Sequence, residues 1–349
     1  MQTRAEGNSQ ANQGQRRLGY REAKASPCLT CPTSPCCSYL PLHKFRITSL
    51  FELDHAVYLL GFDRIELGLA SSGEWSAHYR HPCRFLSRED RGCTVHGTDA
   101  QPHICRRYNP YQCWYRRALA DGSDDEFLRI DRRRMDVILE RIVFGQDRQI
   151  LEVPAWDTLT EAFSELPIED DGVMLAAATS EESPLPTPAG AATESPTTAA
   201  PAFAFGDAAL REPCTGCSAP CCGTLVFPQG VPTIASNLDY FRFSLGFPGV
   251  ELGISDNSWT LVVRTNCRHL QDHRCAIYGT TERPLICSYY DEWTCTYRWQ
   301  YGQSHPPGFV RVGLEAFDAL VSTIQFDASG AVLGLPPVEV LAAHVTGQA

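Results

Sequence analysis

The chain has 349 residues, 43% of them hydrophobic and 20% charged, which is typical of roughly two folded domains. Because no stretch reaches the ~18 consecutive apolar residues of a membrane span, we expect no membrane association. The polar start, residues 1–25, lacks the apolar segment of a signal peptide, which indicates a cytoplasmic protein. The composition therefore disfavours secreted and integral membrane proteins.

The negative charge is concentrated in one segment. The net charge is −11, and residues 152–212 alone carry one basic and 12 acidic side chains. The rest of the chain is close to neutral and shows no basic face, so we expect no nucleic-acid partner.

The first half of the chain begins with a polar segment, residues 1–26, rich in Gln, Asn, Gly and Arg. Such a composition predicts a disordered tail. Farther on, Ser49 and Glu52 form a capping-box pattern and Gly61 supplies a stop, which together predict a helix over residues 50–60.

Two short strands and a second helix follow. Residues 65–67 and 75–79 have the β-rich, partly alternating pattern of strands. After the last cysteine of this half, apolar residues recur on one face of a predicted helix that should be core. This stripe consists of Met135, Ile138, Leu139 and Ile142.

The second half repeats these features about 182–186 residues later. Ser236, Asp239 and Gly246 repeat the capped helix, residues 259–263 repeat the second strand, and the apolar stripe recurs as Phe317, Leu320, Val321 and Ile324. We therefore predict an α+β fold of two tandem small cysteine-rich metal-binding domains, residues 27–171 and 207–349. A disordered Pro/Ala/Thr-rich acidic linker, residues 172–206, should join them.

The 16 cysteines are the most informative residues. In a chain without an export signal they indicate metal ligands or redox chemistry before disulfides. They fall into two matched sets of eight, which we take as the candidate metal ligands. The first set is Cys28, Cys31, Cys36, Cys37, Cys83, Cys93, Cys105 and Cys113, and the second is Cys214, Cys217, Cys221, Cys222, Cys267, Cys275, Cys287 and Cys295.

The spacing of these cysteines suits metal binding. The two-residue gap between Cys214 and Cys217 lets a tight turn aim both sulfurs at one ion. The adjacent pair Cys221 and Cys222 would point to opposite faces of an extended chain. This predicts that the pair splits between two sites, or that only one member binds while its neighbour packs. All-thiolate ligation suits both zinc and an iron–sulfur cluster, so the cofactor stays open between them. A disulfide framework, inert buried thiols and dithiol redox chemistry at Cys214 and Cys217 are the competing interpretations.

The second half also carries a longer motif. It reads Cys-x2-Cys-x3-Cys-Cys from Cys214 to Cys222, then Cys267, then Cys275-Ala-Ile-Tyr278 and Arg283-Pro-Leu-Ile-Cys287. This arrangement resembles the YkgJ-type cysteine-cluster proteins, a family of zinc- or iron-chelating domains. It departs from the family pattern at Ser288, where Arg is frequent, and in a longer gap before Arg283.

The first half matches that pattern less closely. The gap from Cys31 to Cys36 is one residue longer, His96 stands in place of the Tyr, and Gln101 stands in place of the Arg. We therefore expect the first half to hold metal less tightly than the second.

The resemblance implies metal or iron–sulfur binding and leaves the biological role open. One relative, the flagellin lysine methylase, suggests a cluster-dependent oxidoreductase or protein-modifying enzyme, with Arg283 and Tyr278, Tyr289 and Tyr290 near the metal. A structural zinc module that binds an unidentified protein partner is the other alternative. No nucleophile elbow, P-loop or dinucleotide signature nominates catalytic residues. The histidines between the cysteines are predicted to lie at the surface or to pack; they are His96, His103, His269 and His273.

Overall fold

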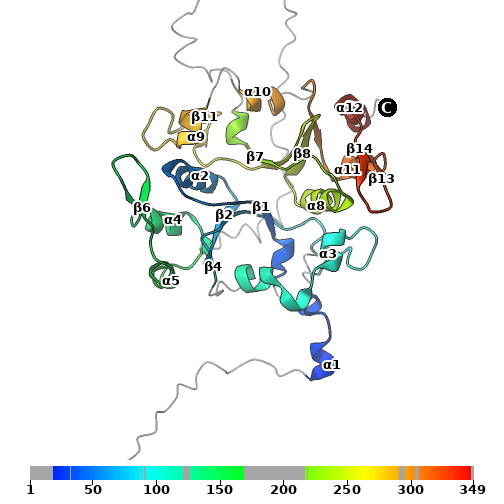
Figure 1. The fold of residues 1–349 in the computed structure, drawn as a ribbon, viewed down its shortest axis with the longest axis horizontal. Coiled ribbons are helices and arrows are strands. Elements are labelled where there is room, and N and C mark those ends of the chain that lie inside the picture. The colour runs from blue at the N-terminus through cyan, green and yellow to red at the C-terminus, as the bar shows by residue number, and fades with distance from the viewer. Residues whose placement is uncertain are drawn as a thin grey trace, which may run out of the picture.

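The computed structural model describes residues 19–31, 33–87, 89, 92–120, 126–168, 217, 219–290, 295–302 and 306–346. The predicted linker and Cys214 lie outside these ranges. So does most of the predicted N-terminal tail, whose described end contains helix α1 (Tyr20–Ala23). Helices alternate with antiparallel sheets, which confirms the α+β class (Figure 1). In the ranges just given, no helix has both the length and the apolar character needed to cross a bilayer.

The first half is built on a four-stranded antiparallel sheet of order β1-β3-β2-β4. Its strands are β1 (Tyr39–Phe45), β2 (Ile65–Ala70), β3 (Trp75–Arg80) and β4 (Phe127–Ile130), and a hairpin adds β5 (Val143–Phe144) and β6 (Ile150–Glu152). Its helices are α2 (Leu50–Leu60), α3 (His103–Arg107), α4 (Arg132–Leu139) and α5 (Trp156–Ser164). Short helical turns are η1 (Pro27–Thr30), η2 (Pro35–Cys37), η3 (Pro110–Gln112) and η4 (Arg116–Ala120).

The second half repeats this arrangement with a sheet of order β7-β9-β8-β12. Its strands are β7 (Thr224–Pro228), β8 (Val250–Ser255), β9 (Ser258–Arg264) and β12 (Val310–Val312), with hairpins β10 (Leu270–Gln271) and β11 (Arg274–Cys275), β13 (Gln325–Phe326) and β14 (Val332–Gly334). Its helices are η5 (Pro220–Cys222), α8 (Ala235–Leu245), α9 (Leu285–Ser288), α10 (Thr296–Gln300), α11 (Leu314–Val321) and α12 (Val338–Thr346). The repeat in the sequence is therefore also a repeat of strand order.

The caps of the two long helices differ from each other. The Ser49 hydroxyl accepts the Glu52 N–H at 3.3 Å, as predicted for the N-cap, and Glu52 accepts the N–H of Thr48, one residue before the position that a capping box uses. The matching prediction for α8 was wrong, because Ser236 lies inside the helix and Ile234 is the N-cap residue. The Asn237 side chain accepts the backbone N–H groups that precede α8. Asp239 therefore does not cap α8. Its carboxylate instead binds the start of α3, as described below.

The predicted strands and core stripes are confirmed. Residues 65–67, 75–79 and 259–263 all lie in strands β2, β3 and β9. In the stripes, Met135, Ile138, Phe317, Leu320 and Ile324 are buried, and Leu139, Ile142 and Val321 pack against them. The helices end earlier than predicted, so Ile142 and Ile324 join the core from beyond the ends of α4 and α11.

The two halves share one hydrophobic core. Buried residues of both sheets and of both long helices belong to a single contiguous cluster. Figure 1 shows α2 of the first half beside α9 of the second, and α3 beside α8. Backbone hydrogen bonds cross the same boundary at the bridge between Phe62 and Cys267, where the Asp63 N–H donates to Asn266 O at 2.9 Å. The halves therefore stabilise each other by burying apolar surface together.

A buried ion-pair cluster occupies corresponding places in both sheets. Glu66, 1% exposed, accepts hydrogen bonds from Arg129 Nε at 2.6 Å and Nη2 at 2.8 Å, and Arg80 Nε lies 3.4 Å away. In the second half Glu251 faces Arg264 at 4.0 Å and Arg311 at 3.7 Å. The second cluster is looser and less buried, so its contribution to stability should be smaller.

Candidate metal centre

Each half presents its adjacent cysteines on a short helical turn. Ser34 before η2 has φ 43° and Ala219 before η5 has φ 52°, so both residues adopt the left-handed conformation. A proline follows each of them, and the turn is closed by backbone bonds such as Cys37 N–H to Ser34 O at 2.9 Å and Cys222 N–H to Ala219 O at 2.9 Å. A non-glycine residue with positive φ costs on the order of 1 kcal/mol, and the same strain occurs in both halves.

This turn corrects the expectation that adjacent cysteines point to opposite faces. The Sγ atoms of Cys36 and Cys37 are 4.0 Å apart, and those of Cys221 and Cys222 are also 4.0 Å apart. Opposite faces are expected of an extended chain, whereas the helical turn brings both sulfurs to one side. Two thiolates bound to one tetrahedral zinc ion at ~2.3 Å would be separated by about 3.8 Å. Each pair therefore has a spacing that suits a single ion.

A third cysteine is tied to each turn by its backbone. Cys83, just beyond β3, donates its N–H to Cys37 O at 2.7 Å, and Cys267, just beyond β9, donates to Cys222 O at 2.6 Å. In the second half the thiols of Cys222 and Cys267 also share a hydrogen bond. The strand that precedes each third cysteine thus fixes it against the turn.

In each half two further cysteines follow the third one along the chain. One lies in the segment before a short helix, and the other lies on that helix, α3 or α9. Burial raises the pKa of Cys105 on α3 to about 12, with repulsion from Cys36, Cys83 and Cys93 added. The pKa of Cys287 on α9 also rises to about 12, because of burial and of repulsion from its neighbours. We define the first thiol cluster as Cys36, Cys37, Cys83, Cys93 and Cys105. The second thiol cluster is Cys221, Cys222, Cys267, Cys275 and Cys287.

The remaining cysteines lie at the edge of these clusters. Cys28 is exposed, and its pKa is raised first by partial desolvation and then by repulsion from Cys36, Cys113 and Cys31. In the second half the Cys295 sulfur accepts the Arg298 N–H at 3.4 Å and so caps α10, which packs against η5. Cys217 is partly buried, and its predicted partner Cys214 lies outside the described residues.

The two clusters differ in acidity. The hydrogen bond from Cys222 lowers the pKa of Cys221 and of Cys267 to about 7. Burial instead raises the pKa of Cys83, the counterpart of Cys267, to about 11. A hydrogen bond from Cys37 lowers the pKa of Cys36, the counterpart of Cys221, in the same way, so the clusters differ at Cys267 and Cys83. Thiolate is the form that binds metal, which favours the second cluster at that position.

Each cysteine-bearing helix is held by an aspartate of the other half. The Asp239 carboxylate on α8 accepts the N–H groups of His103 and Ile104, at 2.8 and 2.6 Å, at the start of α3. Its counterpart Asp54 on α2 accepts the N–H of Leu285 at 2.6 Å, at the start of α9. Two self-contained halves would not show this exchange. Its only signal in the sequence is a Leu-Asp pair that occurs in both halves, Leu53-Asp54 and Leu238-Asp239.

Other contacts confirm that the clusters lie where the halves meet. The Gly246 carbonyl at the end of α8 accepts the Arg84 N–H at 2.9 Å, and the Gly61 carbonyl at the end of α2 accepts the Arg268 N–H at 3.0 Å. A Cβ added to Gly246 would lie 3.3 Å from the Cys83 sulfur. The end of each long helix therefore touches the cysteine region of the opposite half.

Replacing Asp239 by alanine should loosen α3 and the first thiol cluster, because two N–H groups at the helix start lose their acceptor. We expect a loss of about 1–2 kcal/mol in the free energy of unfolding, measured with urea. Asp54→Ala, which removes one bond, should cost less. Asp239→Asn is the control and should retain most of the stability, since its amide oxygen still accepts. A loss for Asp239→Asn as large as for Asp239→Ala would contradict the capping role.

The histidines and aromatic residues contribute less than the thiols. His96, His103 and His273 are exposed and His269 is half-buried, as predicted for surface or packing positions. Tyr289 is 79% exposed, so it shields no cluster. Arg283 does approach the second cluster: its charge lowers the pKa of Cys221, and its guanidinium stacks on the Tyr278 ring at 4.3 Å.

The thiols form neither disulfides nor a completed metal centre. Each of the 15 cysteines in the described ranges is a free thiol. Within those same ranges no three His, Cys, Asp or Glu side chains form a group that could hold a metal ion. Metal ligation by the two sets of cysteines therefore stays a prediction. No family model, curated protein or solved structure matches the chain, so the YkgJ resemblance stays a prediction as well.

Proposed function

We propose that the protein binds zinc or an iron–sulfur cluster through the first and second thiol clusters, one in each tandem domain, residues 27–171 and 207–349. The observation that carries the proposal is the pair of matching helical turns, each with two sulfurs 4.0 Å apart. Partly buried free thiols at this spacing are soft ligands for either metal. Completing the ligand set requires the other thiols to turn toward each pair by side-chain rotation.

Crowding of the thiols supports this function. In the metal-free protein, a hydrogen bond with Cys36 and burial raise the pKa of Cys37. Hydrogen bonds with Cys221 and Cys267, together with burial, raise the pKa of Cys222. Holding several thiolates together in a half-buried site is unfavourable unless a cation compensates their charge. A bound metal ion would supply that charge and displace the thiol protons.

The second cluster should bind more tightly than the first. Cys221 and Cys267 ionise near neutral pH, and Arg283 adds a positive charge that the buried Gln101 does not supply in the first half. This difference supports the affinity order inferred from the motif. The shared core means that the two affinities have to be compared in the full chain and not in separate halves.

Elemental analysis of anaerobically purified full-length protein tests the proposal. We expect iron or zinc at one or more equivalents per chain, with visible absorption only if the metal is iron in a sulfide cluster. Colourless protein with neither metal, before and after reconstitution with each, would refute the proposal.

A second candidate, a cluster-dependent oxidoreductase or protein-modifying enzyme, rests on one observation. Tyr115 lines a cavity, and the pKa of its hydroxyl is raised first by burial and then by Cys36, so the first thiol cluster is its neighbour. A ligand in that cavity would lie near the first cluster. Free thiols suit a reducing cytoplasm, which we propose as the location.

A further inference from the structure

Helix α8 of the second half is bonded to the first thiol cluster at two points. Its Asp239 carboxylate holds the start of α3, the short helix that carries Cys105. The Gly246 carbonyl at its end accepts the N–H of Arg84, the residue after Cys83, at 2.9 Å. Two cysteine-bearing segments of the first cluster are therefore anchored on a helix of the other half.

Helix α2 of the first half makes the matching contacts with the second thiol cluster. Its Asp54 carboxylate holds the start of α9, which carries Cys287. The Gly61 carbonyl at its end accepts the N–H of Arg268, the residue after Cys267, at 3.0 Å. The anchoring of the two clusters is therefore reciprocal.

Each long helix is also linked to the cluster of its own half. After α2, the Arg64 carbonyl accepts the N–H of Arg80 at 2.7 Å, at the end of the strand that leads to the third cysteine of the first half. After α8, the Gly249 carbonyl accepts the N–H of Arg264 at 2.7 Å, at the corresponding end of β9. Both long helices are therefore connected to both clusters by backbone hydrogen bonds.

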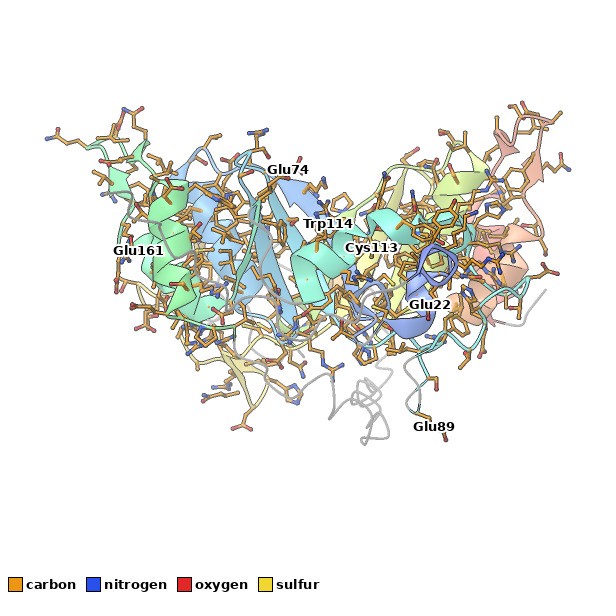
Figure 2. All side chains as sticks on the ribbon, turned by 90° about the horizontal axis from the view of Figure 1, so that it is seen from below. Glu22, Glu74, Glu89, Cys113, Trp114 and Glu161 are labelled. Carbon is orange, nitrogen blue, oxygen red and sulfur yellow. The ribbon has the colours of Figure 1, made fainter. Side chains whose placement is uncertain are left out.

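The segments that make these connections are tightly packed where the halves meet. Phe62 follows α2 and is 1% exposed, and Phe247 follows α8 and is fully buried. Both belong to the single core cluster that joins the halves. In Figure 2, Cys113 is labelled on the cyan segment of the first half, between its blue strands and the yellow elements of the second half. Because close-packed interiors transmit strain, a shift of one long helix also acts on the segments that contact it.

Metal binding has to draw the thiols of a cluster together, because the described part of the chain holds no three side chains already placed to ligate an ion. An ion in the first cluster would fix α3 and the segment after Cys83, and through their anchors it would also fix α8. Fixing chain segments costs conformational entropy. Since α8 is also linked to the strand before Cys267, part of this ordering is complete before the second cluster fills, and a ligand binds more tightly to a site that is already ordered.

We propose that the two thiol clusters bind metal cooperatively, so that an ion in either cluster raises the affinity of the other about tenfold. This inference rests on the proposed function and goes beyond it, because it makes the two halves one binding unit. By thermodynamic linkage the factor is the same in both directions.

The test measures the Zn²⁺ affinities of three full-length proteins by competition with a chromophoric chelator. The Cys36→Ser, Cys37→Ser variant reports the second cluster alone, and the Cys221→Ser, Cys222→Ser variant reports the first cluster alone. We expect the overall association constant for filling both clusters of the unmodified protein to exceed the product of these two constants about tenfold. An overall constant equal to the product would overturn the coupling and leave metal binding by both clusters in place. Absence of Zn²⁺ binding by all three proteins would overturn the coupling and zinc binding together, and the proposed function would then depend on iron–sulfur reconstitution.

The aspartates show whether the long helices carry the coupling. Asp54→Ala combined with Asp239→Ala, in the unmodified protein and in each serine variant, should reduce the tenfold ratio because α3 and α9 lose their bonds to the opposite helix. The Asp54→Asn, Asp239→Asn pair keeps the acceptor oxygens and should keep the ratio. Asp318→Ala is the matched control: it removes a carboxylate that bonds Arg242 of α8 at 2.8 Å within the second half, and it should leave the ratio unchanged. A ratio that survives both alanine substitutions, or that falls equally in the Asp318→Ala variant, would contradict the proposal.

Discussion

Replacing Cys221 and Cys222 together by serine is expected to remove the metal from the second thiol cluster. The two sulfurs lie 4.0 Å apart on η5, a spacing that suits two ligands of one tetrahedral ion. Serine is nearly isosteric but is not a thiolate ligand, so the site loses two ligands at once. Metal content per chain should fall by about half if both clusters are filled, and the unfolding free energy should fall by several kcal/mol.

The matched control is the Cys36→Ser, Cys37→Ser pair on η2, which should remove metal only from the first cluster. The histidine variant His96→Ala, at an exposed position beside Cys93, should leave the metal content unchanged. Unchanged metal in both double-serine variants would exclude the clusters as the binding sites.

Lowering the pH should release metal from the second thiol cluster of the unmodified protein, measured as metal content per chain. The pKa values of Cys221 and Cys267 are lowered from 9.0 to about 7 in the folded protein. Because they are lowered, the thiolate and its stabilising contribution are fully present above pH 9 and are lost as the pH falls through about 7. Bound metal shifts this release to still lower pH, since it competes with the protons.

Replacing Glu66 by glutamine should destabilise the fold by about 3–5 kcal/mol, because it leaves the guanidinium groups of Arg129 and Arg80 buried without a counter-charge. The Glu66 side chain is 2% exposed and those of Arg80 and Arg129 are 9% and 12% exposed, so water cannot replace the lost carboxylate. Urea unfolding followed by circular dichroism would measure the loss.

The second half supplies the control for that variant. Glu251→Gln removes the corresponding carboxylate, which is 29% exposed and lies 3.7–4.0 Å from its arginines. We expect a loss of about 1 kcal/mol or less. Equal losses of unfolding free energy for Glu66→Gln and Glu251→Gln would show that burial does not decide the strength of these ion-pair clusters.

Much of the fold could be predicted because local patterns determine it. The Ser49 cap, the apolar stripes that begin at Met135 and Phe317, and the short strands all depend on neighbours in sequence. The predicted cap at Ser236 was wrong because its spacing to Asp239 has the pattern of a capping box, although Ser236 lies inside α8. The N-cap is instead Ile234, two residues before Ser236, and Asn237 accepts the N–H groups of Thr233 and Ile234.

The candidate site was less predictable, since it depends on contacts between distant segments. The cysteines could be nominated from spacing, but the turn that places Cys221 beside Cys222 requires a left-handed Ala219, which its sequence does not signal. Nor does spacing reveal that Asp239 holds α3 across 136 positions of sequence.

The reciprocal bonds of Asp54 and Asp239 have a consequence for the history of the chain. In an isologous interface, residue i of one partner meets residue j of the other, and j meets i. Such reciprocity is expected of two identical molecules associated around a twofold axis, and the two halves have this geometry within one chain. Their association therefore does not depend on concentration, and the two sides can differ, as His78 of β3 and its counterpart Val262 of β9 do.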